Sequence, residues 1–313
     1  MRIRLESTLT HLFAGPRLAA RSGLLVSAGD HTLVAWTEGK LVASLQTRTS
    51  LRGRLALLAD GRIGWGPFAF ELESGLPEQP PDFVAIAARD LPAVHGRYEL
   101  VTATVAADGH QTALAVRYRP PPGVPHRGSE DVPQSRLVLL EDGMNPRALL
   151  REGVDLPAHT AIGFSRDLLA AGGSARVEVW SRAKAAPVTV LEIGKSHAVR
   201  DLRFSADGSH VAAVTAAGEL GIWSCAEWDR TASVAAHDGP ADAVAWSADG
   251  SMVATAGVGG AAFWDLSGER LGGYEAERIE GVAFGSKGEL FVSRRRDAYV
   301  VDRLRLDEGA EDR

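Results

Sequence analysis

The residues with the chemistry of a binding surface are those that interrupt an otherwise regular pattern. Three arginines stand in a row, and one tryptophan is flanked by glycines in the run Gly64-Trp65-Gly66. Arginine and tryptophan are enriched at the energetic centres of protein interfaces. These residue types therefore predict partner binding rather than catalysis. The candidate partner-binding residues are Trp65, Arg119, His126, Arg127, Arg294, Arg295 and Arg296.

Each of these features has an alternative explanation. Arginines on the surface of an acidic protein are commonly solvated, and Trp65 is large enough to cap a central channel. The proline-rich run 119–135 can be a loop of variable length without a role. The functional interpretation depends on the convergence of these features on one face, and hence on the alignment of the repeats.

The motifs of common enzymes are absent from the sequence. There is no phosphate-binding P-loop, and Gly257–Gly260 precede Trp264 where a strand-to-strand turn is expected, whereas a dinucleotide site needs a helix there. The nine histidines never form His-Glu-x-x-His, and the single Cys225 cannot build a thiolate zinc site. We therefore expect no catalytic residue, no cofactor and no metal.

The elements that must position the binding residues come from a unit that occurs twice between His197 and Asp265. In the two copies Phe204 matches Trp246, Trp223 matches Trp264, and an Asp-Gly pair occupies the same place. Alternating apolar and polar residues predict strands, and Asp-Gly between strands is a strong hairpin signal in which the acid forms the turn. A period of about forty residues with four strands is typical of a propeller blade.

Seven copies of this unit can be aligned along the chain. The equivalent turn positions are Gly15, Asp60, Asp108, Asp167, Asp207, Asp249 and Lys287. They predict an all-β chain of one domain, residues 1–313, folded as a single closed seven-bladed propeller of four-stranded antiparallel blades. The expected blades span about 8–46, 47–90, 97–152, 155–194, 196–234, 237–274 and 276–302.

Three segments depart from the period. Because proline cannot join a strand ladder, the run 119–135 is expected to be a loop insertion between the second and third strands of blade three. Residues 2–7 alternate like a strand, and we expect them to form the outer strand of blade seven, which removes an open edge. The alternative gives that place to Leu304–Leu306. Residues 303–313 are expected to form a charged tail.

The repeated unit resembles the blade of WD-repeat propellers, which contains F-S-x-D-G and ends in Trp-Asp. The matching residues are Phe204–Gly208, Trp246–Gly250 and Trp264-Asp265, and the resemblance is strong over 159–284. In that family a His, a Ser or Thr, an Asp and the Trp form a buried hydrogen-bond chain. The resemblance implies structural roles for Asp30, Trp36, Trp180, Trp223, His237, Thr255 and Trp264.

The sixth blade fits this chain with one member missing. His237, Thr255 and Trp264 are in place, whereas Val258 occupies the position of the acid. A buried hydrogen-bond chain that lacks a member must be completed by water or lost. We therefore expect packing to hold the blades more than this network.

The composition restricts the class of partner and the compartment. The net charge of −6 and the pI of about 5.9 disfavour general nucleic-acid binding, which needs a basic footprint. The single cysteine suits a reducing compartment. Charged residues stand in Met1–Glu6 where a signal peptide is apolar, and no apolar run approaches the about 20 residues of a membrane span. We expect a cytoplasmic monomer without membrane contact.

The resemblance implies a non-catalytic scaffold that binds a protein partner, such as an ATPase or a signalling protein. The partner would dock on the face where the loops between second and third strands emerge. The alternative is a propeller that binds a small ligand or a metal in its central channel, with or without turnover. Asp201 and Asp242 are the nearest candidates for that site, although a charge at the wet mouth of the channel explains them better.

Overall fold

The computed structural model contains strands and very little helix. It describes residues 2–11, 15–48, 50–76, 81–89, 97–120, 135–142, 145–153, 160–194, 197–286, 288–295 and 299–307. Within these residues there are 26 strands and one short helix, α1 (Phe83–Ala87). The prediction of an all-β fold is confirmed. No helix in the described part of the chain has the length and apolar character needed to span a membrane.

The strands form seven antiparallel sheets, in agreement with the number of predicted repeats. The predicted turn at Gly15 is wrong, because the first two strands of the first sheet are joined at Ser22-Gly23. The first sheet contains β2 (Arg17–Arg21), β3 (Leu24–Ala28), β4 (Thr32–Thr37) and β5 (Lys40–Gln46), and the second contains β6 (Leu55–Leu57), β7 (Ile63–Trp65) and β8 (Phe68–Phe70). The third contains β9 (Arg97–Val105), β10 (Gln111–Arg119), β11 (Ser135–Glu141) and β12 (Asn145–Gly153), and the fourth contains β13 (Ala161–Phe164), β14 (Leu168–Gly172), β15 (Arg176–Ser181) and β16 (Ala186–Glu192).

The second half of the chain continues this order. The fifth sheet contains β17 (Val199–Phe204), β18 (His210–Thr215), β19 (Glu219–Ser224) and β20 (Arg230–Ala235), and the sixth contains β21 (Ala241–Trp246), β22 (Val253–Trp264) and β23 (Arg270–Arg278). The seventh sheet combines β24 (Gly281–Phe284), β25 (Glu289–Arg295) and β26 (Tyr299–Asp307) with β1 (Arg2–Thr10) from the start of the chain.

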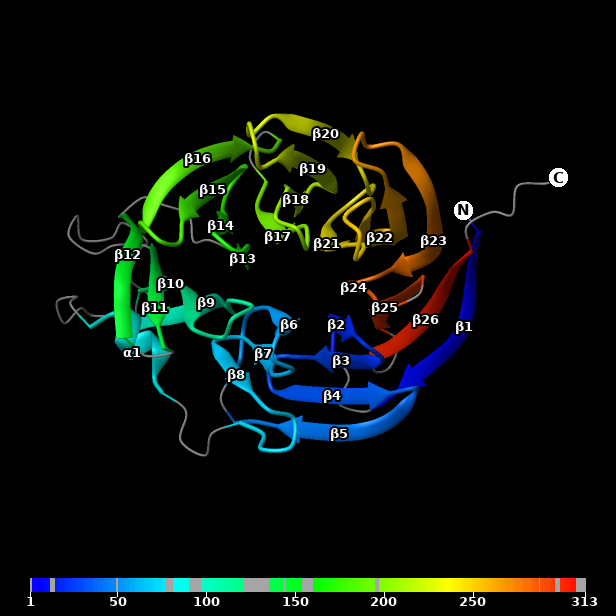
Figure 1. Cartoon of the computed structure of the whole chain (residues 1–313), viewed down its shortest axis with the longest axis horizontal. Helices are drawn as coiled ribbons and strands as arrows, with labels where there is room; N and C mark the ends of the chain where they lie inside the picture. The colour runs from blue at the N-terminus through cyan, green and yellow to red at the C-terminus, as the bar shows by residue number, and fades with distance from the viewer. Residues whose placement is uncertain are drawn as a thin grey trace.

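The sheets stand side by side around a common centre in a propeller-like arrangement (Figure 1). The first strand of each sheet faces the centre. The last strand lies at the outside, except in the seventh sheet, where β1 lies outside β26 (Figure 1). Each first strand contacts the neighbouring sheet, from β2 against β6 through to β24 against β2; between the second and third sheets the contact is made by β7 and β8 against β9.

The Asp-Gly turns have the role that the sequence predicted. The carboxylate of Asp207 accepts hydrogen bonds from the Ser205 hydroxyl (2.6 Å) and from the backbone and hydroxyl of Ser209 (3.0 and 2.9 Å). Gly208 follows with a φ of 76°, a conformation that glycine adopts without strain. These hydrogen bonds lower the pKa of Asp207 to about 2, and Asp249 has the same set of partners. The repeated acids are therefore turn formers.

The core lies between adjacent sheets and has the same composition at several seams. Trp36, Trp180, Trp223 and Trp264 are all buried, with relative exposures of 2–6%. Each packs against the preceding sheet; for example, Trp264 packs against Ala212 and Val214, and Trp36 packs against Phe291 of the seventh sheet. Equivalent tryptophans therefore have equivalent surroundings, as expected for a true structural repeat.

The sixth sheet contains more chain reversals than its strand bounds suggest. The Trp264 Nε1–H donates a hydrogen bond to Thr255 Oγ1 (3.0 Å), although an extended run of nine residues would separate the two by about 30 Å. The chain must therefore fold back inside β22. Gly259 and Gly260, with φ of 88° and 123°, provide the reversal, so β22 supplies two antiparallel segments, the first paired with β21 and the second with β23.

The second sheet differs from the prediction of four strands, because three are present in the part of the chain that is described. Pro77, Pro80 and Pro81 follow the third strand in the sequence, and none of them can donate to a ladder. The chain continues as α1, whose N-cap Asp82 accepts a hydrogen bond from the Ala85 N–H (3.0 Å). Phe83 packs edge-on against Phe68, with ring centroids 5.0 Å apart.

The two ends of the chain meet in the seventh sheet. β1 pairs with β26 along its length, from Arg2 opposite Asp307 to Thr10 opposite Val300. Residues 2–7 are thus the outer strand as predicted, whereas residues 8–10, which the prediction gave to blade one, belong to the same strand. The prediction of a tail from residue 303 is wrong in its first part, because β26 continues to Asp307 and Leu304 and Leu306 are buried. Residues 308–313 lie outside the described residues.

A buried ion pair joins these last strands. Asp302 is completely buried and receives both Nε and Nη2 of Arg294 from β25. It also accepts hydrogen bonds from the hydroxyls of Thr8 on β1 (2.7 Å) and Tyr274 on β23 (3.3 Å). Burial alone would raise the pKa of Asp302, but the bonds from Arg294 and Thr8 outweigh it and lower that pKa. One carboxylate therefore connects four strands.

Candidate functional site

The predicted binding residues are best located by the end of the sheet at which they lie. In each antiparallel sheet, the start of the first strand, the end of the second and the start of the third share one end. We call this end the loop face, because the loops between second and third strands and the connections between sheets lie there. The opposite end is the turn face. Arg119 ends β10 and Arg295 ends β25, so both belong to the loop face.

Trp65 is not available to a partner, contrary to the prediction. The side chain has no exposed surface and belongs to a core cluster with Leu51, Leu55 and Phe68. Its indole N–H donates a hydrogen bond to the carbonyl of Gly29 (3.2 Å) in the first sheet. Trp65 therefore joins the first two sheets, because burying its large apolar ring between them is more favourable than exposing it to solvent.

The arginine triplet does not form one surface patch. Arg294 is held by Asp302, so its charge is neutralised inside the protein. Arg295 is exposed, with its guanidinium 5.9 Å from the centroid of the Tyr299 ring. Arg119 is half-exposed and forms a 2.7 Å ion pair with Glu99. Arg296, His126 and Arg127 lie outside the described residues.

The residues assigned to the structural hydrogen-bond chain are connected in the expected order. The Trp264 indole donates to Thr255 Oγ1 (3.0 Å), which lies 2.9 Å from Nε2 of His237. The other ring nitrogen of His237 lies 3.0 Å from the carbonyl oxygen of Val258. Because a carbonyl only accepts, His237 must donate from Nδ1 and accept from the Thr255 hydroxyl at Nε2.

The structure therefore completes the chain without the acid or a water molecule. The expectation that the chain needs water or is lost was wrong, because the backbone of Val258 supplies the acceptor that its side chain lacks. In the first sheet, Asp30 is instead held by Arg17 (2.5 Å) and lies 3.6 Å from Arg52. At the position of the family's acid, the sixth sheet thus uses a backbone carbonyl as acceptor for its histidine, whereas the first sheet keeps an aspartate that pairs with an arginine.

Replacing Thr255 with valine should reduce the free energy of unfolding by about 1–3 kcal/mol, because the buried indole N–H of Trp264 loses its acceptor while the side-chain volume is almost unchanged. Urea unfolding measures this effect. The control is Thr231→Val at an exposed threonine, which should change stability little. Equal stability of the two variants would show that the chain contributes nothing.

Acid should weaken the protein through His237. Burial lowers the pKa of His237 below its ordinary 6.5, so the folded chain keeps the ring neutral while the unfolded chain protonates it. The free energy of unfolding should therefore fall as the pH drops below about 6.5 and be insensitive to this residue above it. Urea unfolding of wild type and His237→Asn at several pH values tests this. A pH dependence that the variant leaves unchanged would contradict the assignment.

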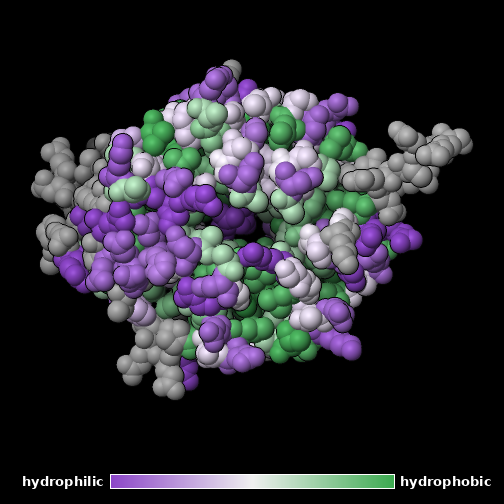
Figure 2. All heavy atoms as spheres, in the orientation of Figure 1, coloured by the Kyte–Doolittle hydropathy of each residue, from purple (hydrophilic) through white to green (hydrophobic). Residues whose placement is uncertain are grey.

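The centre of the loop face contains a cavity of about 410 Å³. The space-filling view is hollowed at the centre of the molecule, where strongly hydrophilic atoms lie beside more hydrophobic ones (Figure 2). The cavity is lined by the starts of the first strands of several sheets. Its charged residues are five arginines and three carboxylates: Arg17, Arg54, Arg200, Arg203, Arg278, Asp201, Asp242 and Glu280. The wall is thus cationic in a chain of net charge −6.

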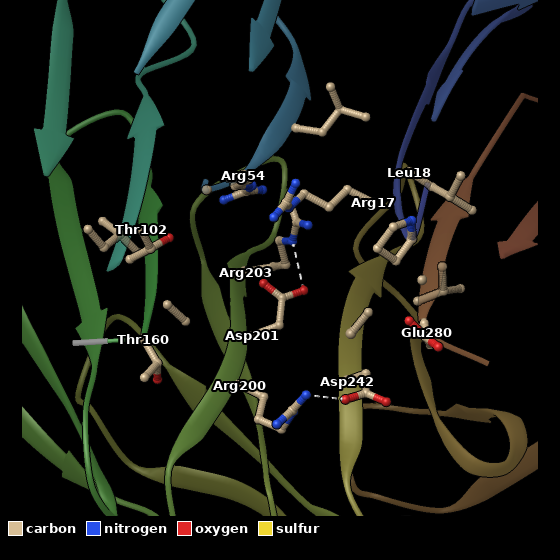
Figure 3. Close-up of a pocket in the computed structure, with 18 of the residues that line it drawn as sticks. Arg17, Leu18, Arg54, Thr102, Thr160, Arg200, Asp201, Arg203, Asp242 and Glu280 are labelled. Atoms are coloured by element: carbon tan, nitrogen blue, oxygen red, sulfur yellow. Dashed lines mark hydrogen bonds and ion pairs between the residues drawn. The ribbon is translucent and has the colours of Figure 1, made fainter. Parts of the chain in front are cut away.

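The acids that the sequence singled out are both held by arginines. Asp242 forms 2.7 Å ion pairs with Arg200 and Arg278. Asp201 meets Nε of Arg203 at 3.3 Å and accepts hydrogen bonds from the backbone N–H groups of Leu202 (3.0 Å) and Val244 (3.1 Å). Figure 3 shows the Asp201–Arg203 and Asp242–Arg200 pairs on the cavity wall. These carboxylates are structural partners of arginines.

Metal binding has no support in this cavity. Within the residues that the structure describes, no three His, Cys, Asp or Glu side chains come together in a way that could hold a metal ion. The chemistry of the cavity is that of guanidinium groups, which are hydrogen-bond donors and cannot be metal ligands while charged. The arrangement therefore suits an anion.

Sequence reasoning missed Arg17, Arg54 and Arg203. Arg17 begins β2, Arg54 directly precedes β6, and Arg203 is the fifth residue of β17. The available signal was that several of the first strands carry an arginine in or next to them. Other repeats have a small residue at such a position, for example Ala245 and Ala283 in place of Arg203.

No protein-family model matches the sequence, and a search of curated proteins finds none that is significantly similar. The fold and the cavity therefore carry the functional argument.

Proposed function

We propose that the chain is a closed seven-bladed propeller of the WD-repeat type and that it is a non-catalytic binding module for a protein partner. The contacts between all seven neighbouring pairs of sheets support closure of the ring, as does the pairing of β1 with β26. The hydrogen-bond chain through His237, Thr255 and Trp264 supports the type of repeat.

The observation that carries the proposed function is the cationic centre of the loop face. Arginines outnumber carboxylates there in an otherwise acidic protein. Arg52, Arg119 and Arg295 lie on the same face, and all three are exposed to solvent. Complementary charge accelerates encounter and selects partners, so the partner presents an acidic surface to this face. A cytoplasmic monomer that docks one partner is the form that we propose.

The test is charge reversal on the loop face, with Arg52, Arg119 and Arg295 changed to Glu in one variant. The control changes Lys40, Arg166 and Lys184 to Glu; all three are exposed and lie at the turn face. Because each variant replaces three cationic side chains with Glu, the two variants have the same net charge. Affinity purification from the native cell should recover a protein with wild type and with the control, and at least tenfold less of it with the loop-face variant. Recovery that is equal with both variants would contradict docking on this face.

A further inference from the structure

The strongest unexplained feature of the molecule is an arginine without a counter-ion. Arg54 lines the central cavity, and no residue in the described part of the chain accepts a hydrogen bond from its buried Nε. Burial, and then the neighbouring Arg203, lower the pKa of Arg54 to about 9, and the charge of Asp201 opposes this shift only in part, so the side chain stays charged at neutral pH. A buried cation without a partner is destabilising, so its retention calls for a ligand.

The backbone of Arg54 is held close to the third sheet. Its backbone N–H donates to the carbonyl of Ala103 (2.8 Å), and its carbonyl accepts from Gly66 (3.0 Å). Gly53 has a φ of 135°, and a Cβ there would lie 2.1 Å from the Ala103 oxygen, so only glycine permits this approach. The backbone that carries the Arg54 side chain is thus fixed against the third sheet by hydrogen bonding and by this close approach.

A glycine in the fourth sheet leaves space for the Arg54 guanidinium. A Cβ on Gly163 in β13 would lie 3.2 Å from Nη1 of Arg54, so a larger residue would crowd the group. Arg54 and Arg203 also line a second cavity, of about 480 Å³, that lies toward the turn face. The two guanidinium groups therefore stand between two open spaces at the middle of the channel.

The nearby carboxylates cannot neutralise Arg54. Asp201 is already engaged by Arg203 and by two backbone N–H groups, and Asp242 is shared by two arginines. Arg203 uses only Nε in its contact with Asp201, so its terminal nitrogens remain available to a ligand in the described structure. Figure 3 shows Arg54 and Arg203 directed into the same cavity. Two guanidinium groups facing one space offer the paired donors that phosphate and carboxylate groups accept.

We propose that the central cavity is an oxyanion site, in which Arg54 and Arg203 bind the phosphate or carboxylate group of a small ligand. The first cavity, at about 410 Å³, is within the usual size range of small-molecule sites. This inference goes beyond partner docking and requires no protein partner. The anion supplies the counter-charge that Arg54 lacks and stabilises the folded chain when it binds.

Isothermal titration calorimetry with inorganic phosphate tests the site directly, with sulfate and acetate as further titrants at constant ionic strength. Phosphate and sulfate binding without acetate assigns a phosphoryl-type ligand, and acetate binding assigns a carboxylate. Arg54→Met should weaken phosphate binding at least tenfold. The control Arg166→Met, at an exposed arginine of the turn face, should bind like wild type.

Thermal melting gives a second readout that a merely structural role would not produce. Phosphate should raise the melting temperature of wild type and leave that of Arg54→Met unchanged, and without phosphate the variant should melt no lower than wild type, because an unpaired cation has been removed. Arg54→Lys keeps the charge without the fork and should bind phosphate with an affinity between those of wild type and Arg54→Met.

Two results would overturn the oxyanion site: wild type that binds none of the three anions, or Arg54→Met and Arg54→Lys that both bind phosphate as wild type does. Should Arg54→Met not fold, undiminished affinity in Arg54→Lys is sufficient to reject the site. Affinity purification with Arg54→Lys separates the two proposals. Weakened phosphate binding with the partner retained leaves docking intact, and loss of the partner with phosphate binding unchanged concerns docking only.

Discussion

Asp302→Ala is expected to destabilise the folded chain by about 3–5 kcal/mol, which is the usual effect of removing one member of a buried ion pair. The substitution leaves Arg294, whose side chain is only 14% exposed, without its carboxylate. It also removes the acceptor of the Thr8 and Tyr274 hydroxyls. Because Asp302 and Thr8 lie on β26 and β1, the strands that join the chain ends, urea unfolding should shift as a whole.

Two further variants identify the origin of this loss. Asp229→Ala removes an exposed carboxylate and should change stability by less than about 1 kcal/mol. Combining Asp302→Ala with Arg294→Met removes the uncompensated cation, so the double variant should be more stable than Asp302→Ala alone. A double variant of equal or lower stability would place the origin elsewhere than in the ion pair.

Trp65→Ala is expected to cost about 3–5 kcal/mol of unfolding free energy, because it opens a large cavity in the seam between the first two sheets. Trp65→Phe keeps most of the ring and loses the hydrogen bond to Gly29, so it should cost less. Denaturant unfolding of both variants gives these values.

The same variants distinguish a core residue from a binding residue. Leu41→Ala truncates an apolar side chain that is 51% exposed and should leave stability nearly unchanged. Since Trp65 has no exposed surface, Trp65→Phe should still recover the partner. Normal stability of Trp65→Ala combined with loss of the partner would restore Trp65 to the binding surface.

The hydrophobic pattern, the turn residues and the repeated tryptophans were enough to predict seven small antiparallel sheets. These features act over a few residues: alternation selects the strand, Asp-Gly selects the turn, and a terminal tryptophan fills the seam. The same local signals predicted that residues 2–7 form a strand. They did not predict that the second sheet has α1 after its third described strand, since the prolines there only exclude a strand and do not specify a helix.

The roles of individual polar residues were decided by the tertiary structure. Arg294 and Asp302 are neighbours across two strands, and nothing in the run of three arginines shows that one of them is buried. The acceptor for His237 is a backbone carbonyl, which a side-chain motif cannot reveal.

By itself, the sequence determined the number and kind of sheets, because period and turn chemistry are properties of neighbouring residues. The tertiary structure alone decided that Trp65 faces the core and that Arg54 faces the central cavity. Both outcomes depend on how separate sheets meet around one centre. Burial and pairing of charge there are set by residues that are far apart in the chain, so no local pattern contains them.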